Sequence, residues 1–152
     1  MSDSYQTIAD VDATDDEAEA LAAGIVTWLA AAGIVAGRAP LGMHPNGVEI
    51  ITGRTVFDPL AADRVACPDC RAEADFEWVS EAIGDWHAGG DGRRACPACG
   101  RPLTLNDWDW EPAWAFGCLG LRFWNWPPLR PSFAAEVASR LGHRVVIVTG
   151  RL

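Results

Sequence analysis

The stretch CPDC (Cys67–Cys70) recurs as CPACG (Cys96–Gly100), and residues 71–95 separate the two copies. Both follow the Cys-Pro-x-Cys spacing of the knuckles in zinc ribbons. In such a knuckle a tight turn points backbone N–H groups at the thiolates, and a Gly after the last ligand allows a positive φ. Two knuckles supply four thiolates, which make a closed tetrahedral site of the structural kind. We therefore expect a structural Zn²⁺ ion bound by Cys67, Cys70, Cys96 and Cys99.

Other uses of the four cysteines are less consistent with the sequence. A thioredoxin-like redox motif is a single Cys-x-x-Cys near a βαβ pattern, whereas here two matched copies occur. A disulfide framework belongs to exported proteins, and the acidic N-terminus lacks the basic region of a signal peptide. An iron–sulfur or rubredoxin-like iron site stays open as the alternative metal. Cys118 lies in the apolar run AFGCLGLRF, so we expect it to be a buried free thiol.

The insert between the knuckles predicts one amphipathic helix. Its apolar residues recur at helical spacing, with acidic residues between them; these residues are Phe76, Val79, Ile83 and Trp86. The following HAGGDGRR has the composition of a loop that returns to the second knuckle. We expect residues 64–102 to form a zinc-ribbon lobe inserted into a larger domain.

The rest of the chain predicts an α+β fold, a small mixed β-sheet packed by two helices. One helix should follow the capping box of Thr14 and Glu17 and end at Gly33. The second should have Ser132 as its N-terminal cap and end at Gly142. Strands are expected within 34–38, 48–57, 103–110, 119–126 and 143–152. The α+β domain would then be discontinuous, residues 14–63 with 103–152.

Charge is spread unevenly along the chain. The formal net charge is −9, and the first twenty residues contain acidic but no basic side chains. We interpret residues 1–13 as a solvated acidic arm. An acidic protein is repelled by nucleic acid and by anionic membranes. Residues 20–37 are uncharged, but they are rich in Ala and Gly and too weakly apolar for a membrane span. We expect a cytoplasmic protein.

Tryptophan is the unusual residue type. The chain has 8, and five lie within residues 108–126. Trp contributes strongly to both cores and binding surfaces, so we expect two or three of the five in the core. The segment WNWPPLRP is stiffened by its prolines and is a candidate preformed ridge. The predicted partner-binding residues are Trp108, Trp110, Trp114, Trp124, Trp126 and Arg130.

A short pattern ends three predicted strands with Gly-Arg: IVAGR (34–38), IITGR (50–54) and IVTGR (147–151). The simple interpretation is that Gly stops each strand and Arg enters water. If at least two of these strand ends converge, however, Arg38, Arg54 and Arg151 would form an anion-binding cluster.

No catalytic motif is present. The sequence lacks a phosphate-binding loop, a G-x-S-x-G elbow and an H-E-x-x-H helix. His44, His87 and His143 are isolated in sequence, and we expect surface or capping roles for them. We assign no catalytic residue.

Taken together, the two knuckles, GVEIITGRTVF, FWNWPPL and LGHRVVIVTG resemble a group of small uncharacterised proteins of high-GC bacteria. Some of these are labelled sugar-transporter ATPases. The resemblance implies no activity, and an ATPase would need the phosphate-binding loop and lysine that this chain lacks.

These features favour a non-enzymatic, zinc-stabilised protein-binding module, an adaptor or an antitoxin- or immunity-type inhibitor, that uses a Trp/Pro-rich surface. Two alternatives stay open. One is a nucleic-acid-binding zinc-ribbon protein, in which aromatic and Arg side chains would stack on bases. The other is a binder or enzyme for a small anionic ligand at the Gly-Arg strand ends.

Overall fold

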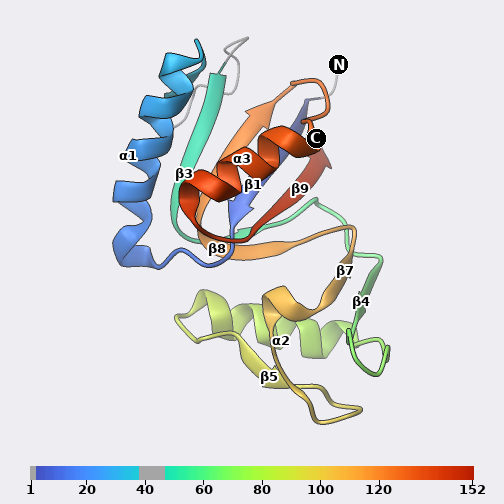
Figure 1. The fold of residues 1–152 in the computed structure, drawn as a ribbon. Helices are drawn as coiled ribbons and strands as arrows, with labels where there is room; N and C mark the ends of the chain where they lie inside the picture. The colour runs from blue at the N-terminus through green and yellow to red at the C-terminus, as the bar shows by residue number, and fades with distance from the viewer. Residues whose placement is uncertain (1–2, 38–46) are drawn as a thin grey trace.

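The computed structural model describes residues 3–37 and 47–152. Its main element is a five-stranded sheet in the order β2-β3-β8-β1-β9 (Figure 1). These strands are β1 (Ser4–Asp10), β2 (Val35–Gly37), β3 (Gly47–Phe57), β8 (Ala115–Trp124) and β9 (Val145–Arg151). β2 is parallel to β3, and all other neighbours are antiparallel. The mixed sheet and its helices confirm the α+β class.

The N-terminal residues do not form the solvated arm that the charge count suggested. β1 lies between β8 and β9, and Thr7, Ile8 and Asp10 are fully buried. Acidic residues lie before and after residues 4–9, which carry no charge and include residue types that favour strands. The net charge of the first twenty residues gives no indication of this short uncharged run.

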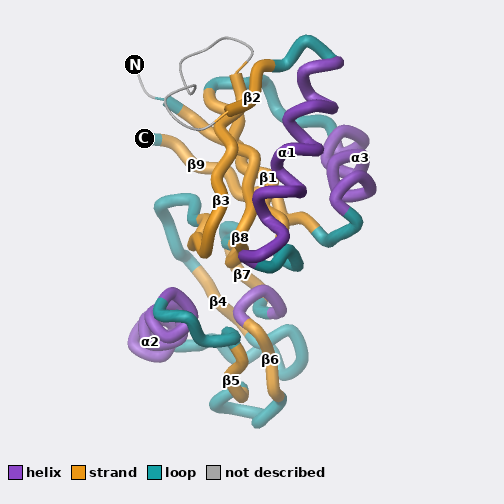
Figure 2. The backbone as a smooth tube through the Cα atoms, turned by 90° about the vertical axis from the view of Figure 1, so that its left-hand side faces the viewer, coloured by secondary structure: helices purple, strands orange, loops and turns teal. Residues whose placement is uncertain are grey.

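Two helices cover one face of the sheet, as Figure 2 shows from the side. They are α1 (Asp15–Ala31) and α3 (Pro131–Leu141). Their buried side chains share one core with β1, β3 and β8; the members include Ile25, Leu29, Val137, Ile8, Val48 and Leu121. Gly33 and Gly142 take positive φ after the two helices, as predicted. The cap of α3 is Arg130 and not the predicted Ser132, because proline at 131 is well suited to the first helical position.

The second face of the sheet is covered in part by two aromatic rings. Phe57, at the end of β3, lies over Gly120, where an added Cβ would be 2.5 Å from the ring. Tyr5 lies over Gly150 in the same way, and its hydroxyl donates to the Asp58 carbonyl at 2.7 Å. The chain that leaves β3 therefore packs against the sheet before it reaches the lobe.

The knuckles lie in a separate lobe with its own core, at the bottom of Figure 1. Its elements are β4 (Arg64–Ala66), α2 (Phe76–His87), β5 (Arg93–Ala95), β6 (Pro102–Thr104), a 3-10 turn (Leu105–Asp107) and β7 (Asp109–Glu111). β4 pairs with β7, and β5 pairs with β6. The predicted helix is confirmed. The predicted strand over 103–110 is instead split by the 3-10 turn, because Asp107 caps that turn by accepting from the backbone N–H and hydroxyl of Thr104.

In the described part of the chain, no helix has the length and apolar character needed to cross a bilayer.

Candidate metal centre

The four predicted ligands converge in the lobe. The sulfur atoms of Cys67, Cys70, Cys96 and Cys99 all lie within 4.8 Å of one another. The Sγ–Sγ distance is 3.9 Å for Cys67 and Cys99 and 3.8 Å for Cys70 and Cys96. A disulfide would require about 2.05 Å. Metal–sulfur bonds of about 2.3 Å in a tetrahedron place the sulfurs about 3.8 Å apart. The cluster therefore has the dimensions of a four-thiolate metal site.

The same backbone hydrogen bond closes each knuckle. Arg71 N–H donates to Cys67 C=O at 3.0 Å, and Gly100 N–H donates to Cys96 C=O at 2.8 Å. The residue after the last ligand has positive φ in both, +66° at Arg71 and +76° at Gly100. The second knuckle thus uses the predicted Gly, whereas the first holds a non-glycine residue in the same left-handed conformation.

The four thiols lie so close together that the ionisation of one affects the pKa of the others. A backbone N–H at Cys99 is the main cause that lowers the pKa of Cys96 to about 7. At Cys70 a backbone hydrogen bond from Ala72 lowers the pKa, but lost hydration and three neighbouring sulfurs raise it to about 11. Sulfurs this close do not all ionise on their own. A divalent cation bound between the four sulfurs would favour the ionised form of every one of them.

The core beside the cluster is built largely from tryptophan. The rings of Trp78 and Trp108 lie 4.8 Å apart, and those of Trp110 and Trp114 lie 5.2 Å apart. Trp108 and Trp110 are buried, and the Trp110 indole donates to the Leu105 carbonyl at 2.8 Å. These two side chains pack the lobe and cannot form the partner surface proposed for them. The other three are half-buried, in line with the expectation of two or three core residues.

Trp124 and Trp126 lie on different faces of the sheet. Trp124 packs against Tyr5 on the second face, and its indole donates to Glu49 at 3.1 Å. Trp126 packs against Phe123 in the core under the helices, and its indole donates to the Gly47 carbonyl at 3.1 Å. Asn125 between them has φ +59°, so the alternation of the strand ends there.

The Trp/Pro-rich segment borders a hollow with a volume of about 520 Å³. Its lining is mainly apolar. Residues 126–130 form one part of it, α3 contributes Ser132, Phe133 and Glu136, and Ile34 comes from the segment after α1. Gln6 fixes this segment, because its amide donates to the carbonyls of Trp126 and Pro127 and its carbonyl accepts from Leu129 N–H at 2.7 Å. We call this the Trp126 hollow.

The predicted arginine cluster does not form among the residues described. Arg54 lies within the bulge of β3, between Thr52 and Thr55. It donates to the carbonyls of Trp86 and Gly90 in the lobe, and its guanidinium lies 4.4 Å from the Trp86 ring centre. Arg151 pairs in register with Ser4 at the far end of the sheet. Two strands separate β3 from β9. Arg38 lies outside the described residues.

One polar pair was missed at the sequence level. His143 Nδ1 lies 2.7 Å from the carboxylate of Asp10, which is fully buried, and His143 Nε2 lies 3.6 Å from Glu17. The hydrogen bond to Asp10 is the main cause that raises the pKa of His143. No local pattern could reveal this pair, since the two residues are 133 positions apart and meet only when β1 enters the sheet.

Cys118 is buried beside this pair in the main core, as predicted, and burial is the main cause that raises the pKa of its thiol.

Comparison of the chain with protein-family models, with curated proteins and with solved structures gave no match, so the assignment of a metal centre comes from the four cysteines themselves.

Proposed function

We propose that this chain is a non-enzymatic protein-binding module of the bacterial cytoplasm, stabilised by zinc, whose partner contacts the Trp126 hollow. The zinc part is supported by the sulfur–sulfur distances, which fit metal–thiolate bonds of about 2.3 Å. Four protein ligands fill a tetrahedral site and leave no position for substrate, which favours a structural role. The bacterial and cytoplasmic parts are supported by the sequence resemblance alone.

The observation that carries the binding function is the Trp126 hollow. It is apolar, and a volume of about 520 Å³ lies within the range of small-molecule and side-chain pockets. Its wall is held before binding, because Gln6 makes three hydrogen bonds to residues 126–129. A preformed surface loses little conformational entropy when a partner docks. Trp and Arg are also the residue types most enriched in binding hot spots.

The charge of the chain supports a basic partner. The formal net charge is −9, and long-range attraction accelerates association with a basic protein. An adaptor in a larger assembly and an antitoxin- or immunity-type inhibitor both fit this description. In either case the apolar hollow would contribute most of the binding free energy, and the acidic surface would increase the association rate constant.

The test uses the full zinc-loaded chain, purified gently from cells that produce it naturally and weighed by native mass spectrometry. We expect a complex of defined mass with a second protein. Pro128→Glu places a charge on an exposed residue of the hollow, so it should abolish the complex without unfolding the chain.

The control is Ala135→Glu, which adds the same charge at an exposed site on α3 outside the hollow. This variant should keep the complex. A complex that survives Pro128→Glu would show that the partner binds elsewhere. A chain that carries zinc but no second protein at its natural concentration would contradict the function.

A further inference from the structure

Phe76 is unusually exposed for an aromatic side chain. It is the first residue of α2, and 86% of its surface is accessible to solvent. Four large hydrophobic residues in the described chain are exposed, and Phe76 is the most exposed of them. The preceding residue, Asp75, caps the helix by accepting from Trp78 N–H at 2.8 Å. The helix start is therefore fixed, and the Phe76 ring is held at its surface.

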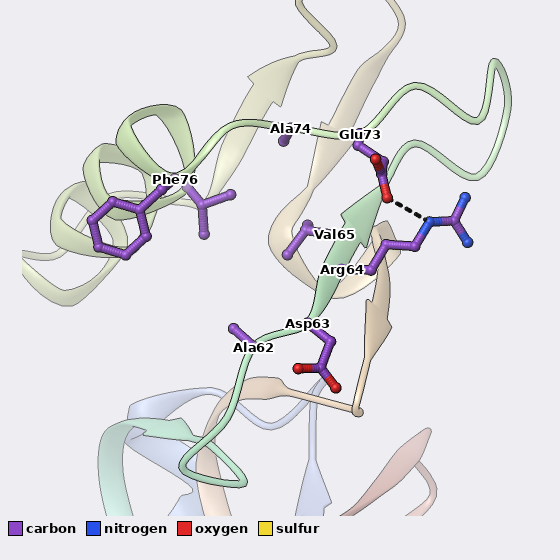
Figure 3. A pocket seen from close by; sticks show the side chains of 8 residues that line it. Ala62, Asp63, Arg64, Val65, Glu73, Ala74 and Phe76 are labelled. Carbon is purple, nitrogen blue, oxygen red and sulfur yellow. Dashed lines mark hydrogen bonds and ion pairs between the residues drawn. The ribbon is translucent and has the colours of Figure 1, made fainter.

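Phe76 borders a second hollow, which lies between α2 and β4 (Figure 3). Its volume is about 230 Å³. A cavity of about 150 Å³ is enough to hold a benzene ring, so one large apolar side chain fits here. Four further apolar residues line it, namely Ala62, Val65, Ala74 and Val79, of which Val65 and Val79 also belong to the lobe core. We call this the Phe76 hollow.

The rim of the Phe76 hollow is acidic. Asp63 and Glu73 line it, and Asp75 and Glu77 flank Phe76 in the sequence. The only basic residue in the lining is Arg64, whose Nε lies 3.0 Å from Glu73 and whose Nη1 lies 3.9 Å from Glu111. Its charge is thus shared by two carboxylates. Within the described residues, the Asp63 carboxylate takes part in no ion pair.

We propose that the Phe76 hollow docks a short segment of a partner protein in which one apolar side chain is flanked by Lys or Arg. The apolar side chain would occupy the space between Phe76, Val65 and Val79. The flanking cations would lie against Asp63 and the carboxylates beside Phe76. An anionic or purely polar segment is disfavoured by the same rim.

This site is independent of the Trp126 hollow. The two lie beyond opposite ends of β8, whose ten residues span about 30 Å. One partner could contact both only by extending along the whole molecule. The docking of a basic apolar segment can therefore be tested without the partner proposed above.

The experiment titrates the full zinc-loaded protein, labelled with ¹⁵N, with the blocked peptide acetyl-Arg-Lys-Leu-Lys-Arg-amide. We expect saturable shifts of the backbone amides of Val65, Ala74, Phe76 and Val79. A peptide with Ser in place of Leu should bind about tenfold more weakly, since it keeps the charge and loses the apolar contact. A peptide with Glu in place of every basic residue should show no binding.

Two variants locate the site. Phe76→Ala changes an exposed residue and should leave the fold intact while it weakens the leucine peptide about tenfold. Its control is Val35→Ala, at another exposed hydrophobic residue far from the lobe. Asp63→Asn should weaken binding, whereas Asp16→Asn, at an exposed position in α1, should not.

The proposal is overturned by any of three results. One is the absence of saturable shifts. Another is equal binding of the leucine and serine peptides, which would show charge attraction alone. The third is shifts confined to residues 126–136, which would move the peptide to the Trp126 hollow and so support the function proposed above instead.

Discussion

Each knuckle contributes one buried and one exposed cysteine. Cys67 and Cys96 are buried in the lobe core, whereas Cys70 and Cys99 are exposed. The buried cysteines would connect a bound metal ion to the lobe core that contains the tryptophans, and the exposed ones would close the site toward solvent. At the scale of the residue, the buried pair should therefore matter most for the order of the lobe, because their loss affects both the metal and the packing.

Cys96→Ser should lower the zinc content from one ion per chain to near zero, since a structural site needs all four ligands. The lobe should lose its fixed aromatic packing, because metal binding supplies folding free energy to small metal lobes. Metal analysis and near-UV circular dichroism measure the two effects. Cys118→Ala, outside the cluster, is the control and should keep its zinc. A Cys96→Ser protein that still binds one zinc ion tightly would contradict the site.

His143 should make stability depend on pH. Its pKa is raised in the folded protein, chiefly by the hydrogen bond to buried Asp10, with Glu17 and Asp12 also nearby. The His143 ring therefore binds its proton more tightly in the folded state than in the unfolded state, so protonation stabilises the fold. This stabilisation is complete below the ordinary pKa of about 6.5 and is lost as the pH rises through the higher folded value.

Urea unfolding between pH 5.5 and 8.5, followed by a signal from the main sheet, measures this effect. The difference in unfolding free energy between wild type and His143→Asn should shrink as the pH rises, because the stabilisation by protonated His143 is lost. The contribution of the thiols is the same in both proteins and cancels in the comparison. Ala135→Asn, at an exposed position of α3 that carries no titratable group, is the control and should show no such trend. A difference that is constant over the pH range would show that the hydrogen bond to Asp10 does not raise the pKa of His143.

At the scale of the element, β8 is shaped by glycines that admit its neighbours. Gly120 faces the Phe57 ring, and Gly117 lies against the backbone of Asp10, where an added Cβ would be 2.2 Å from the carbonyl oxygen. Glycine normally weakens a strand. In β8, however, Gly117 lets the strand approach the end of β1, and Gly120 leaves room for the Phe57 ring. The packing of β8 therefore requires glycine at both positions.

Gly120→Ala should destabilise the protein by about 1–3 kcal/mol, the usual cost of overpacking. The new Cβ would stand 2.5 Å from Phe57 and 3.2 Å from Thr7, and neither side chain has room to move, since both are fully buried. Gly24→Ala is the matched control. Nothing lies within 4 Å of its added Cβ, and it stands inside α1, so this change should stabilise by about 0.5–1 kcal/mol. Urea denaturation compares the two, and equal effects would rule out the clash.

At the scale of the whole molecule, features encoded locally were predictable and features that depend on long-range contacts were not. The knuckles, α1 and α2 each follow from the spacing of nearby residues, and all three formed as predicted. β1 was missed because a strand in the middle of a sheet is recognised by its partners, which are residues 119–124 and 145–151. Its short uncharged run offered only a weak local signal.

The same reason explains the errors in the candidate sites. Trp108 and Trp110 are two residues apart, so they share one face of an extended segment, and that face is buried in the lobe core. Arg54 was grouped with Arg151 by sequence similarity, yet the bulge in β3 directs it to the lobe. Neither outcome could be deduced before the relative position of sheet and lobe was known.

The place where the lobe enters the chain has a kinetic consequence. Phe57 and Ala115 are register partners in the sheet, and the whole lobe lies between them in sequence. Closing so long a segment costs entropy and slows the pairing of β3 with β8. If the proposed zinc ion orders the lobe first, β4 and β7 are already paired and would bring the two strands together, much as a short turn does in a hairpin. The metal would then set how fast the sheet forms after synthesis, and a shortage of zinc would leave newly made chains open for longer.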